Sequence, residues 1–310
     1  MEKAVFKLDR KDQRIIAELE RDGRQSITRI AKKIGVSKEV AAYRFRRLQE
    51  SGLIKGFRLL VDYYSLGFQT YRLLINLSNL RESVRKKIIS ELRSLKNAEI
   101  SVFLLSRWDI EVQMWIQHPK EFYSFYNSFI AKYSNYVHDR ELFVITKEHF
   151  TLHGHIHQGS GRIMLGDQKT AKRIDNIDRK MLLLLAENPR KDVVSLAAKS
   201  GMPASTLQYR IKNLLAKNII KGVIPLLDTN LLGYSRYRVE IILNEPAKKN
   251  TLVQHFIALP NTIRITELVG SKDISFDADF RTAAELDRFL DDLSVKFPYI
   301  KDFEVISVLE

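Results

Sequence analysis

The sequence predicts an α+β fold in which two helix-turn-helix units alternate with two βαββαβ units. Three observations support this prediction: the chain repeats itself, each repeat opens with three short amphipathic helical patterns, and alternating strand and helix patterns follow each repeat. Residues 8–67 align with residues 174–233 at a constant offset of 166 and without a gap, placing Ile54-Lys55-Gly56 on Ile220-Lys221-Gly222. A gapless match over about sixty residues indicates that one polypeptide carries two copies of the same unit.

Composition limits the classes of protein to consider. With 310 residues, 45% hydrophobic and 28% charged, the chain is long enough for two to four compact domains. No apolar run approaches the ~18 to 20 residues of a membrane span, and no apolar segment of signal-peptide type follows the first residues. We therefore expect a cytoplasmic protein without a membrane partner. The lack of cysteine excludes disulfides, thiolate metal sites and cysteine nucleophiles.

The net charge of +14 is concentrated in the two copies. Residues 1–68 and residues 169–234 each carry +7, whereas residues 69–168 carry +3 and residues 235–310 carry −3. A basic excess confined to the repeated units favours a polyanionic partner such as double-stranded DNA. A generally basic surface of solvated lysines is the alternative, and the localisation of the charge argues against it.

Each copy contains the pattern of a helix-turn-helix. In the first copy, apolar spacing predicts helices over residues 9–20, 27–34 and 38–51. The expected N-caps are Asp9, Ser26 and Ser37. The same spacing in the second copy predicts helices over residues 178–187, 193–200 and 204–217. Gly35 and Gly201 permit the tight turn before each third helix, so we expect two winged-helix-like units.

The third helix of each copy carries the residues that we expect to contact DNA. The helical period turns Ala41, Phe45 and Leu48 inward and leaves polar and small side chains outside. Arg and Lys can pair with guanine and Gln with adenine. The predicted DNA-binding residues are Ser37, Lys38, Glu39, Tyr43, Arg44, Arg46 and Arg47 in the first copy, and Ser205, Gln208, Tyr209, Arg210 and Lys212 in the second. For Arg44 and Arg210, phosphate contact and a structural ion pair remain equal alternatives. Protein contact is the alternative use of these helices.

A strand and helix pattern follows each helix-turn-helix. In the first copy the expected strands cover residues 71–77, 100–105, 110–116 and 137–146, and the expected helices cover residues 82–95 and 119–133. In the second copy the strands cover residues 238–243, 263–269, 274–280 and 303–309, and the helices cover residues 249–259 and 283–297. This is the order of a ferredoxin-like sandwich, whose sheet leaves one face uncovered by helices. We expect the two sheets to pair face to face as a pseudo-dimer inside one chain.

Four of the seven histidines lie in the linker, residues 149–170. On an extended segment, His153, His155 and His157 project to one side, a spacing that can place imidazoles around Zn²⁺, Ni²⁺ or Cu²⁺. The histidine stretch holds no carboxylate or thiol, which favours a solvated or strand-pairing linker over a metal-responsive site.

The other predicted domains are the helix-turn-helix units, residues 1–66 and 171–232, and the sandwiches, residues 67–148 and 233–310.

The motifs of the first copy resemble a known family. They are Leu8-Asp9-x-x-Asp12-x-x-Ile15-Ile16, Asp22-Gly23-Arg24, Ile34-Gly35-Val36-Ser37, Arg44-Phe45-x-x-Leu48 and Gly52-Leu53-Ile54-Lys55-Gly56-Phe57. Together they resemble the Lrp/AsnC family of leucine-responsive regulators. The second copy departs from them with Asn188-Pro189-Arg190 and with Asn218 in place of Gly52. Members of the family carry one helix-turn-helix and one βαββαβ domain that dimerises, so the resemblance implies two fused units, DNA binding and further assembly into homo-oligomers.

The resemblance also implies a place for an amino-acid effector. In the family, a Gly-x-x-Asp element between the second and third strands of the sandwich lies near the effector site. The second copy keeps it as Gly270-Ser271-Lys272-Asp273, whereas the first has Ser106-Arg107-Trp108-Asp109. The implied effector-binding residues are Gly270, Lys272, Asp273, Trp108 and Asp109, with the second copy favoured. A plain β-turn capped by its Asp is the alternative.

Catalytic motifs are missing from the sequence. It contains no P-loop, Gly-x-Gly-x-x-Gly, Gly-x-Ser-x-Gly or His-Glu-x-x-His, so we expect no catalytic residue and no cofactor. Some proteins of the resembled fold act on sirohaem as decarboxylases, and His118, His138 and His255 are the candidates for such a role, although they match no motif. The basic third helices favour a transcriptional regulator. Because those two helices differ, we expect an asymmetric operator.

Overall fold

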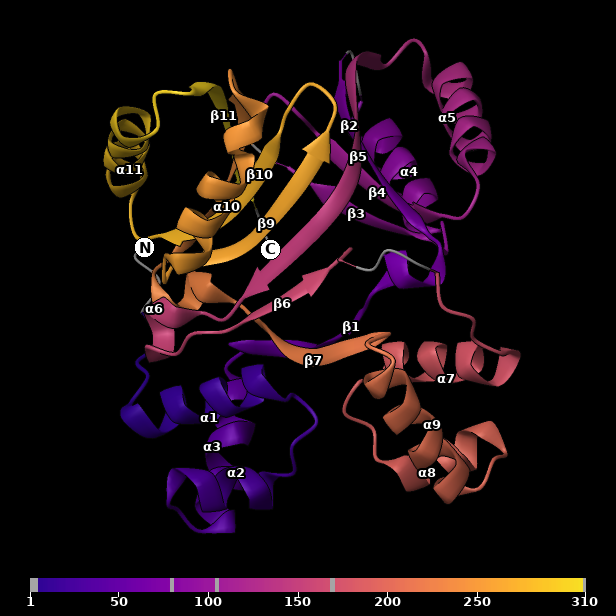
Figure 1. The fold of residues 1–310 in the computed structure, drawn as a ribbon, viewed down its shortest axis with the longest axis vertical. Coiled ribbons are helices and arrows are strands. Elements are labelled where there is room, and N and C mark those ends of the chain that lie inside the picture. The colour runs from indigo at the N-terminus through magenta and orange to yellow at the C-terminus, as the bar shows by residue number, and fades with distance from the viewer. Residues whose placement is uncertain (1–4, 79–80, 104–105, 168–170, 309–310) are drawn as a thin grey trace.

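The computed structural model describes residues 5–308 except residues 79–80, 104–105 and 168–170. Leu104, Leu105 and Leu309 of the expected strands therefore lie outside the described residues. Two helix-turn-helix units and two βαββαβ units alternate along the chain, which confirms the predicted fold class (Figure 1). None of the described helices is both long enough and apolar enough to cross a membrane.

Both helix-turn-helix units have three helices, as predicted. The first unit contains α1 (Arg10–Arg21), α2 (Ile27–Ile34) and α3 (Lys38–Glu50), and the second contains α7 (Asn176–Glu187), α8 (Val193–Ser200) and α9 (Ala204–Ala216). The side chains of Asp9, Ser26 and Ser37 accept hydrogen bonds from backbone N–H groups of the following first turns, so the predicted N-caps are confirmed. Gly35 ends α2 in the left-handed region, at φ +74°, where a side chain would cause strain.

The two sandwiches repeat one order of elements. The first comprises β2 (Gln69–Leu77), α4 (Glu82–Arg93), β3 (Ala98–Val102), β4 (Ile110–Ile116), α5 (Pro119–Tyr133) and β5 (Val137–Thr151). The second comprises β8 (Ser235–Leu243), the 3₁₀ turn η3 (Pro246–Lys248), α10 (Lys249–Ala258), β9 (Thr262–Val269), β10 (Ile274–Phe280), α11 (Ala283–Lys296) and β11 (Ile300–Val308). The strand orders are β5-β2-β4-β3 and β11-β8-β10-β9, and antiparallel pairing of β5 with β9 joins them into one sheet.

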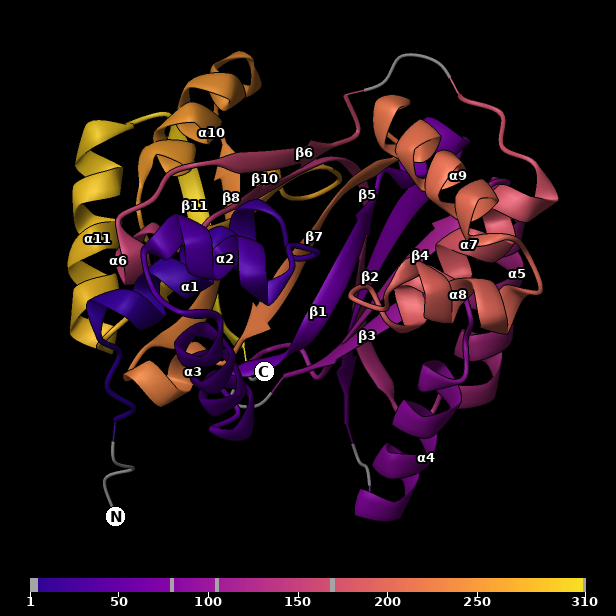
Figure 2. The same ribbon diagram turned by 90° about the horizontal axis from the view of Figure 1, so that it is seen from below.

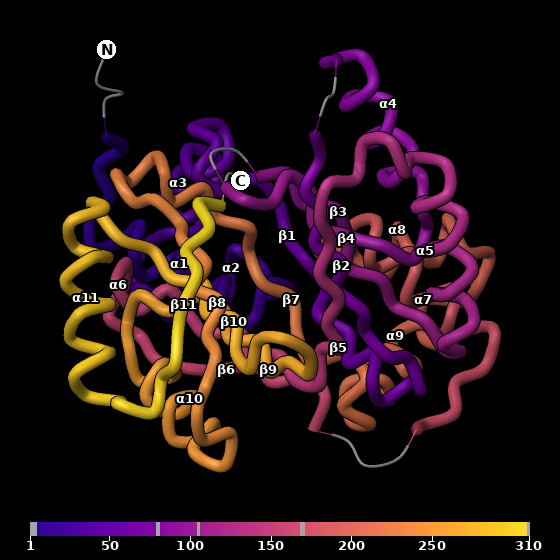
Figure 3. Tube along the Cα trace, turned by 90° about the horizontal axis from the view of Figure 1, so that it is seen from above, coloured from indigo at the N-terminus to yellow at the C-terminus, as the bar shows by residue number. Residues whose placement is uncertain are grey.

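The helices lie outside and the strands lie between them. Figure 3 shows α10 and α11 on one flank and α4 and α5 on the other. Apolar residues that alternate along β2 and β8, such as Leu73 and Val239, pack under these helices. The other faces of the two four-stranded halves of this sheet meet, with Leu74, Phe143 and Ile306 in a shared cluster. The face that the helices leave uncovered is therefore covered by the other sandwich.

The strand that follows each helix-turn-helix pairs with its counterpart in the other copy. β1 (Ile54–Val61) and β7 (Ile220–Leu227) form an antiparallel two-stranded ribbon, continued by the 3₁₀ turns η1 (Tyr63–Leu66) and η2 (Thr229–Leu232). Seen from below, the ribbon runs between the two three-helix units (Figure 2). It connects both units to the sandwiches above them.

The linker is not extended where its histidines lie. β5 continues to Thr151, past the predicted boundary at residue 148, and a single helical turn, α6 (Gly154–His157), follows. β6 (Arg162–Leu165) then pairs with the end of β5. The turn has a physical reason, because it places Ile156 in the core of the first helix-turn-helix, where 6% of the residue is exposed. The expected projection of His153, His155 and His157 to one side is therefore wrong.

Candidate nucleic-acid interface

Both third helices expose polar side chains and one tyrosine. On α3, the exposed side chains include Lys38, Glu39, Tyr43 and Arg46, and Ser37 is exposed at the N-cap. On α9, they include Ser205, Gln208, Tyr209 and Lys212. Tyr43 and Tyr209 occupy the same position of the repeat and are 67% and 65% exposed. Apolar neighbours such as Leu48 and Leu214 are buried, so each helix has one solvent-exposed face and one face packed against its unit.

Arg44 and Arg210 form the same ion pairs in the two units. Arg44 Nη1 lies 2.6 Å from Asp9 Oδ2 and 2.9 Å from Asp12 Oδ1. Arg210 Nη1 lies 2.6 Å from Asp175 Oδ2 and 2.8 Å from Asp178 Oδ1. The backbone N–H of Asp12 and the Arg44 guanidinium lower the pKa of Asp9, although partial burial opposes them. These contacts favour the ion-pair alternative for both arginines, since each ties a third helix to the start of the first helix of its unit.

Arg47 differs from its exposed neighbour Arg46. It forms an ion pair with the fully buried Asp12, and its guanidinium carbon lies 5.4 Å from the centre of the Phe6 ring. Arg46 is exposed and forms no ion pair among the described residues. Of these two predicted DNA-binding arginines, Arg46 is therefore the one whose guanidinium is available to a base.

Reciprocal ion pairs join the ribbon to the turns of the opposite unit. Lys55 Nζ lies 3.0 Å from Asp228 Oδ2, and Lys221 Nζ lies 3.8 Å from Asp62 Oδ2. Lys221 and Asp228 stand 166 residues after Lys55 and Asp62, so the two contacts are equivalent. Backbone hydrogen bonds of 2.9 Å repeat the same exchange, from Asp62 to Ile219 and from Asp228 to Leu53. The two helix-turn-helix units are thus held by contacts that repeat with approximate two-fold symmetry.

Buried charges lie between the two sandwiches. Arg72 Nη1 of β2 donates to Glu240 Oε1 of β8 at 2.8 Å, and Arg238 pairs across the same interface with Glu111. Both arginines are almost fully buried. Arg238 also binds Asp277 within its own sheet, at 2.7 Å. Burial would raise the pKa of Asp277, but Arg238 and Arg264 outweigh it and hold this pKa well below its usual value.

The implied effector residues lie in two equivalent turns. Asp109 Oδ2 accepts the N–H of Leu77 at 2.7 Å, and Asp273 Oδ2 accepts the N–H of Leu243 at 2.9 Å. Both aspartates therefore cap the ends of neighbouring strands, as the plain-turn alternative requires. Trp108 is 1% exposed within the shared cluster between the sheets.

The second turn packs closely on β5. A Cβ added at Gly270 would lie 2.9 Å from the Phe143 ring, so the glycine is needed for this approach. Lys272 Nζ lies 3.4 Å from Glu304 Oε2 of β11. The turn therefore lies at the junction of the two sandwiches.

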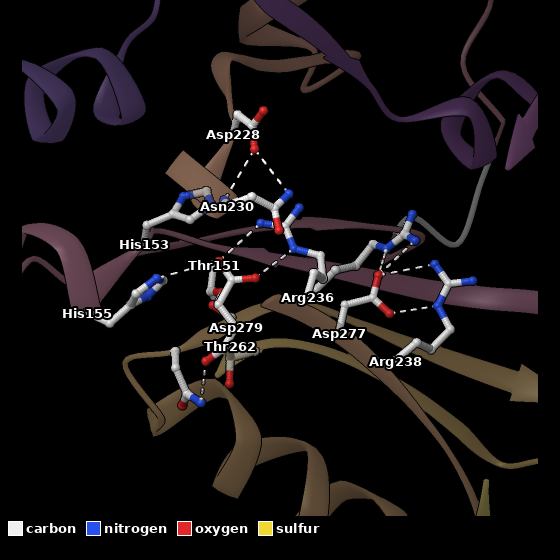
Figure 4. Close-up of polar contacts among 12 residues, drawn as sticks. Thr151, His153, His155, Asp228, Asn230, Arg236, Arg238, Thr262, Asp277 and Asp279 are labelled. Carbon is white, nitrogen blue, oxygen red and sulfur yellow. Dashed lines mark hydrogen bonds and ion pairs between the residues drawn. The ribbon is translucent and has the colours of Figure 1, made fainter. Parts of the chain in front are cut away.

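A cavity of about 340 Å³ lies between the ribbon and the second sandwich. The basic side chains that line it are Lys55, Arg58, Arg236, Arg238 and Arg264. Each of them is paired with a carboxylate of Asp228, Glu99, Asp279 or Asp277, at distances of 2.5 to 3.0 Å. Figure 4 shows Asp277 beside the guanidinium group of Arg238 and Asp279 beside that of Arg236. The positive charge of the lining is thus largely compensated by the protein itself.

Two of the linker histidines contact a carboxylate of the first helix-turn-helix. His153 Nδ1 and His157 Nε2 both contact Glu20 of α1, and the His153 backbone N–H donates to it at 3.1 Å. Burial would raise the pKa of Glu20, but the two imidazoles outweigh it and lower this pKa to about 2. His155 faces elsewhere, with Nδ1 3.2 Å from the carbonyl of Pro260 and Nε2 3.5 Å from Asp279 Oδ2 (Figure 4).

Glu20 is the residue that sequence reasoning missed. Glu20 lies far from the histidines in the sequence. The sequence does show one difference at this position, since the offset aligns Glu20 of the first copy with Ala186 of the second. Within the part of the chain that the structure describes, no three His, Asp or Glu side chains are arranged to hold a metal ion. In this structure His153 and His157 attach the linker to α1.

The histidines considered for a tetrapyrrole are dispersed. His118 is exposed at the N-cap of α5, and His138 is exposed on β5. His255 lies on α10 against the ring of Phe297, at 4.9 Å between centroids. None of the three lines the cavity between the ribbon and the second sandwich.

Comparisons with known proteins agree with this arrangement. Residues 8–49 match the model of the AsnC-type helix-turn-helix domain, and residues 174–221 match that of a winged helix-turn-helix DNA-binding domain. An uncharacterised helix-turn-helix-type transcriptional regulator of Pyrococcus furiosus is 30% identical over 118 residues, which span 38% of this chain and 79% of the relative. A similar regulator of Pyrococcus abyssi is 28% identical over 132 residues, covering 43% of this chain and 84% of the relative.

One solved structure resembles nearly the whole molecule. The siroheme decarboxylase NirDL superimposes on 97% of this chain and 91% of its own, with a TM-score of 0.65 and 8% identity. At this identity the similarity concerns the fold. It shows that the alternating arrangement of the four units is found in another protein.

Proposed function

Because this chain belongs to the Lrp/AsnC family of helix-turn-helix transcriptional regulators, we propose that it binds double-stranded DNA sequence-specifically through α3 and α9. The observation that carries the proposal is the pair of exposed third helices, mounted on one ribbon and each bearing polar groups suited to base edges. The concentration of charge in these two units supports it, because phosphate contacts supply much of the affinity for DNA.

The two halves act, in this proposal, as a pseudo-dimer within one chain. The reciprocal Lys55–Asp228 and Lys221–Asp62 pairs and the Arg72–Glu240 contact between the sandwiches support it. A homodimer presents two identical readers and therefore favours a palindromic site. Here Lys38, Glu39 and Arg46 correspond to Ala204, Ser205 and Lys212. We therefore propose an asymmetric operator.

On the basis of the family resemblance, we propose that a small-molecule effector binds at the Gly270 turn. Trp108 is buried at the equivalent turn of the first sandwich, whereas the second turn keeps the Gly-x-x-Asp pattern and lies at the junction with β5 and β11. An amino acid bound there would touch both sandwiches. Thermal unfolding of the protein with each of the twenty amino acids would detect it as a rise in Tm that Asp273→Asn abolishes.

We propose regulation of transcription rather than catalysis on a tetrapyrrole. The supporting observations are the dispersion of His118, His138 and His255 and the internal pairing of the cavity arginines. Two measurements on one purified sample separate the functions. The absorption spectrum is recorded with and without sirohaem, and retention of genomic DNA fragments is then followed as salt is raised.

The regulator is expected to retain a few fragments, and an increase from ~50 to ~200 mM salt should weaken binding by roughly 10³-fold or more. Such a slope arises because each phosphate contact releases a counterion. A Soret band that forms with sirohaem, together with no retained fragment at low salt, would overturn the proposal and favour the enzyme.

A further inference from the structure

The turns that join the first two helices of each DNA-binding unit lie against the opposite unit. The backbone N–H of Gly23 donates to the carbonyl of Val223, in the ribbon strand β7, at 2.8 Å. A Cβ at Gly23 would lie 2.5 Å from that oxygen, closer than atoms can approach. The first unit therefore contacts the strand that follows the second unit with no space between them.

Two arginines at equivalent positions extend this contact in both directions. Arg24 donates to the carbonyl of Pro189 and, at 3.0 Å, to that of Lys191. Arg190 donates to the carbonyl of Gly23 and, at 3.1 Å, to that of Gln25. Each guanidinium thus spans the turn of the other unit. Burial lowers the pKa of both arginines, which indicates that their charges are partly withdrawn from water.

One of the two arginines also reaches the recognition helix of the opposite unit. The guanidinium carbon of Arg190 lies 5.0 Å from the ring centre of Phe45, on α3, and 4.7 Å from that of Phe57, on β1. Cations favour such positions over aromatic faces. The residues equivalent to the two rings are Ile211 and Val223, so only Arg190 has this second anchor.

We propose that Arg24 and Arg190 form a clasp that holds α3 and α9 at one separation and orientation and thereby selects the spacing between the two half-sites. The proposal rests on the proposed DNA-binding function and goes beyond it by naming positioning residues for operator choice. Two recognition helices engage one face of DNA only when their half-sites are about one helical turn, roughly 10 to 10.5 base pairs, apart or at a multiple of it. A rigid pair accepts one such register, whereas independently mobile units accept several.

The first test measures the separation without DNA. The chain has no cysteine, so Glu50→Cys and Lys217→Cys, at exposed positions at the ends of α3 and α9, create a unique pair of sites for spin labels. Pulsed dipolar spectroscopy on the full chain should give one narrow distance distribution, and Arg24→Gln with Arg190→Gln should broaden it. Arg288→Gln with Lys301→Gln, at exposed positions on α11 and β11 and outside both units, is the charge-matched control. A distribution that is already broad in the parent chain, or that the double variant leaves unchanged, would overturn the clasp.

The second test measures operator choice. Duplexes carrying the operator recovered from genomic DNA are lengthened between the half-sites by one to five base pairs. The wild type should lose affinity by about tenfold or more away from its preferred spacing, which corresponds to about 1.4 kcal/mol. Arg24→Gln with Arg190→Gln should remove most of this discrimination while its affinity for an isolated half-site stays at the wild-type level. Equal weakening on all duplexes would show instead that the arginines contact DNA.

A variant without a charge change guards against a purely electrostatic effect. Gly23→Ala inserts a methyl group against Val223 and should relax the spacing preference in the same way. An unchanged preference in both Gly23→Ala and the double arginine variant would contradict the proposal. If the wild type binds no genomic fragment, the proposed function and the spacing claim both fail, and the spin-label distances still decide whether the two arginines fix the helices.

Discussion

Glu20 joins the linker to the first DNA-binding unit. Its carboxylate is buried and is contacted by two imidazoles and by the backbone N–H of His153. The N–H of Gly159 donates to His157 Nδ1 at 3.0 Å, so Nε2 of that ring carries the proton directed at Glu20. The ionised carboxylate is thus held by several donors at a site without bulk water.

Glu20→Gln is expected to lower the free energy of unfolding by about 3 to 4 kcal/mol near neutral pH. The folded-state pKa of about 2 lies well below the usual 4.5, and each tenfold change in the ionisation equilibrium corresponds to roughly 1.4 kcal/mol. Because the folded-state pKa is depressed, this stabilisation is fully present above pH 4.5 and is lost as the pH falls towards 2. Urea unfolding between pH 7 and pH 2.5 should show the two proteins converging. Glu50→Gln, an exposed change on α3, should show no such convergence, and a pH-independent deficit for Glu20→Gln would contradict the assignment.

Arg46 and Arg44 are expected to respond differently to alanine. Arg46 is exposed on α3, so Arg46→Ala should relax base preference at one half-site by about 1 to 3 kcal/mol without lowering Tm. Arg44 pairs with Asp9 and the buried Asp12, so Arg44→Ala should chiefly lower Tm. Competition binding with single-base operator variants and thermal unfolding separate the effects. The same loss of base preference in both variants would contradict the separate roles.

Residue roles that depend on neighbours in the sequence could be predicted, whereas roles that depend on contacts between distant segments could not. The caps Asp9, Ser26 and Ser37 could be predicted because each binds a backbone group within three residues. The contact between Glu20 and His153 joins positions 133 residues apart, and no local pattern encodes it. The helical period predicted that Arg47 faces solvent, but it could not show that the Arg47 guanidinium forms an ion pair with Asp12 of another helix.

The helices α3 and α9 occupy equivalent positions in the two copies but expose different side chains. If the exposed residues determine base preference, transfer of the α3 set into α9 should make the preferred operator an inverted repeat. The variant is Ala204→Lys, Ser205→Glu, Gln208→Ala and Lys212→Arg. Selection from a random duplex library and sequencing of the bound fraction would reveal the new preference. Recovery of the wild-type sequence would show that other groups carry the specificity.

The main elements could be predicted because their periods are strong and each has its own caps or turns. The pairing of β1 with β7 could not be predicted, because the two strands lie far apart in the sequence and no local pattern indicates which strand pairs with which. The turn α6 was also missed. Its four residues are set by the burial of Ile156 in a core formed by other segments.

At the scale of the whole molecule, ion pairs cross the interface between the sandwiches. The sequence predicted that the uncovered sheet faces would meet, but not that Arg72, Glu240, Arg238 and Glu111 would line the contact. Such groups alternate with core residues on β2 and β8, so they resemble solvent-facing positions in a single copy. Only the second copy, placed opposite, buries them.

Glu240→Leu is expected to lower the free energy of unfolding by about 3 to 5 kcal/mol, because it removes the carboxylate 2.8 Å from the buried guanidinium of Arg72 and leaves Glu111, 3.4 Å away, as the other ion-pair partner. The double variant Arg72→Met with Glu240→Leu should regain most of this loss, since it leaves no unpaired buried charge at that contact. Chemical unfolding of the wild type, both single variants and the double variant measures the coupling. Additive losses would show that the contact does not stabilise the interface.

Hydroxyl-radical footprinting of the wild type on an operator recovered from genomic DNA tests the central claim most directly. The account predicts two protected half-sites of different sequence on one face of the duplex, occupied together at the lowest protein concentration that gives protection. Arg46→Ala should weaken protection at one of them only. A perfect inverted repeat, or protection of a single half-site, would contradict the claim that one chain carries two different DNA readers that act as a pair.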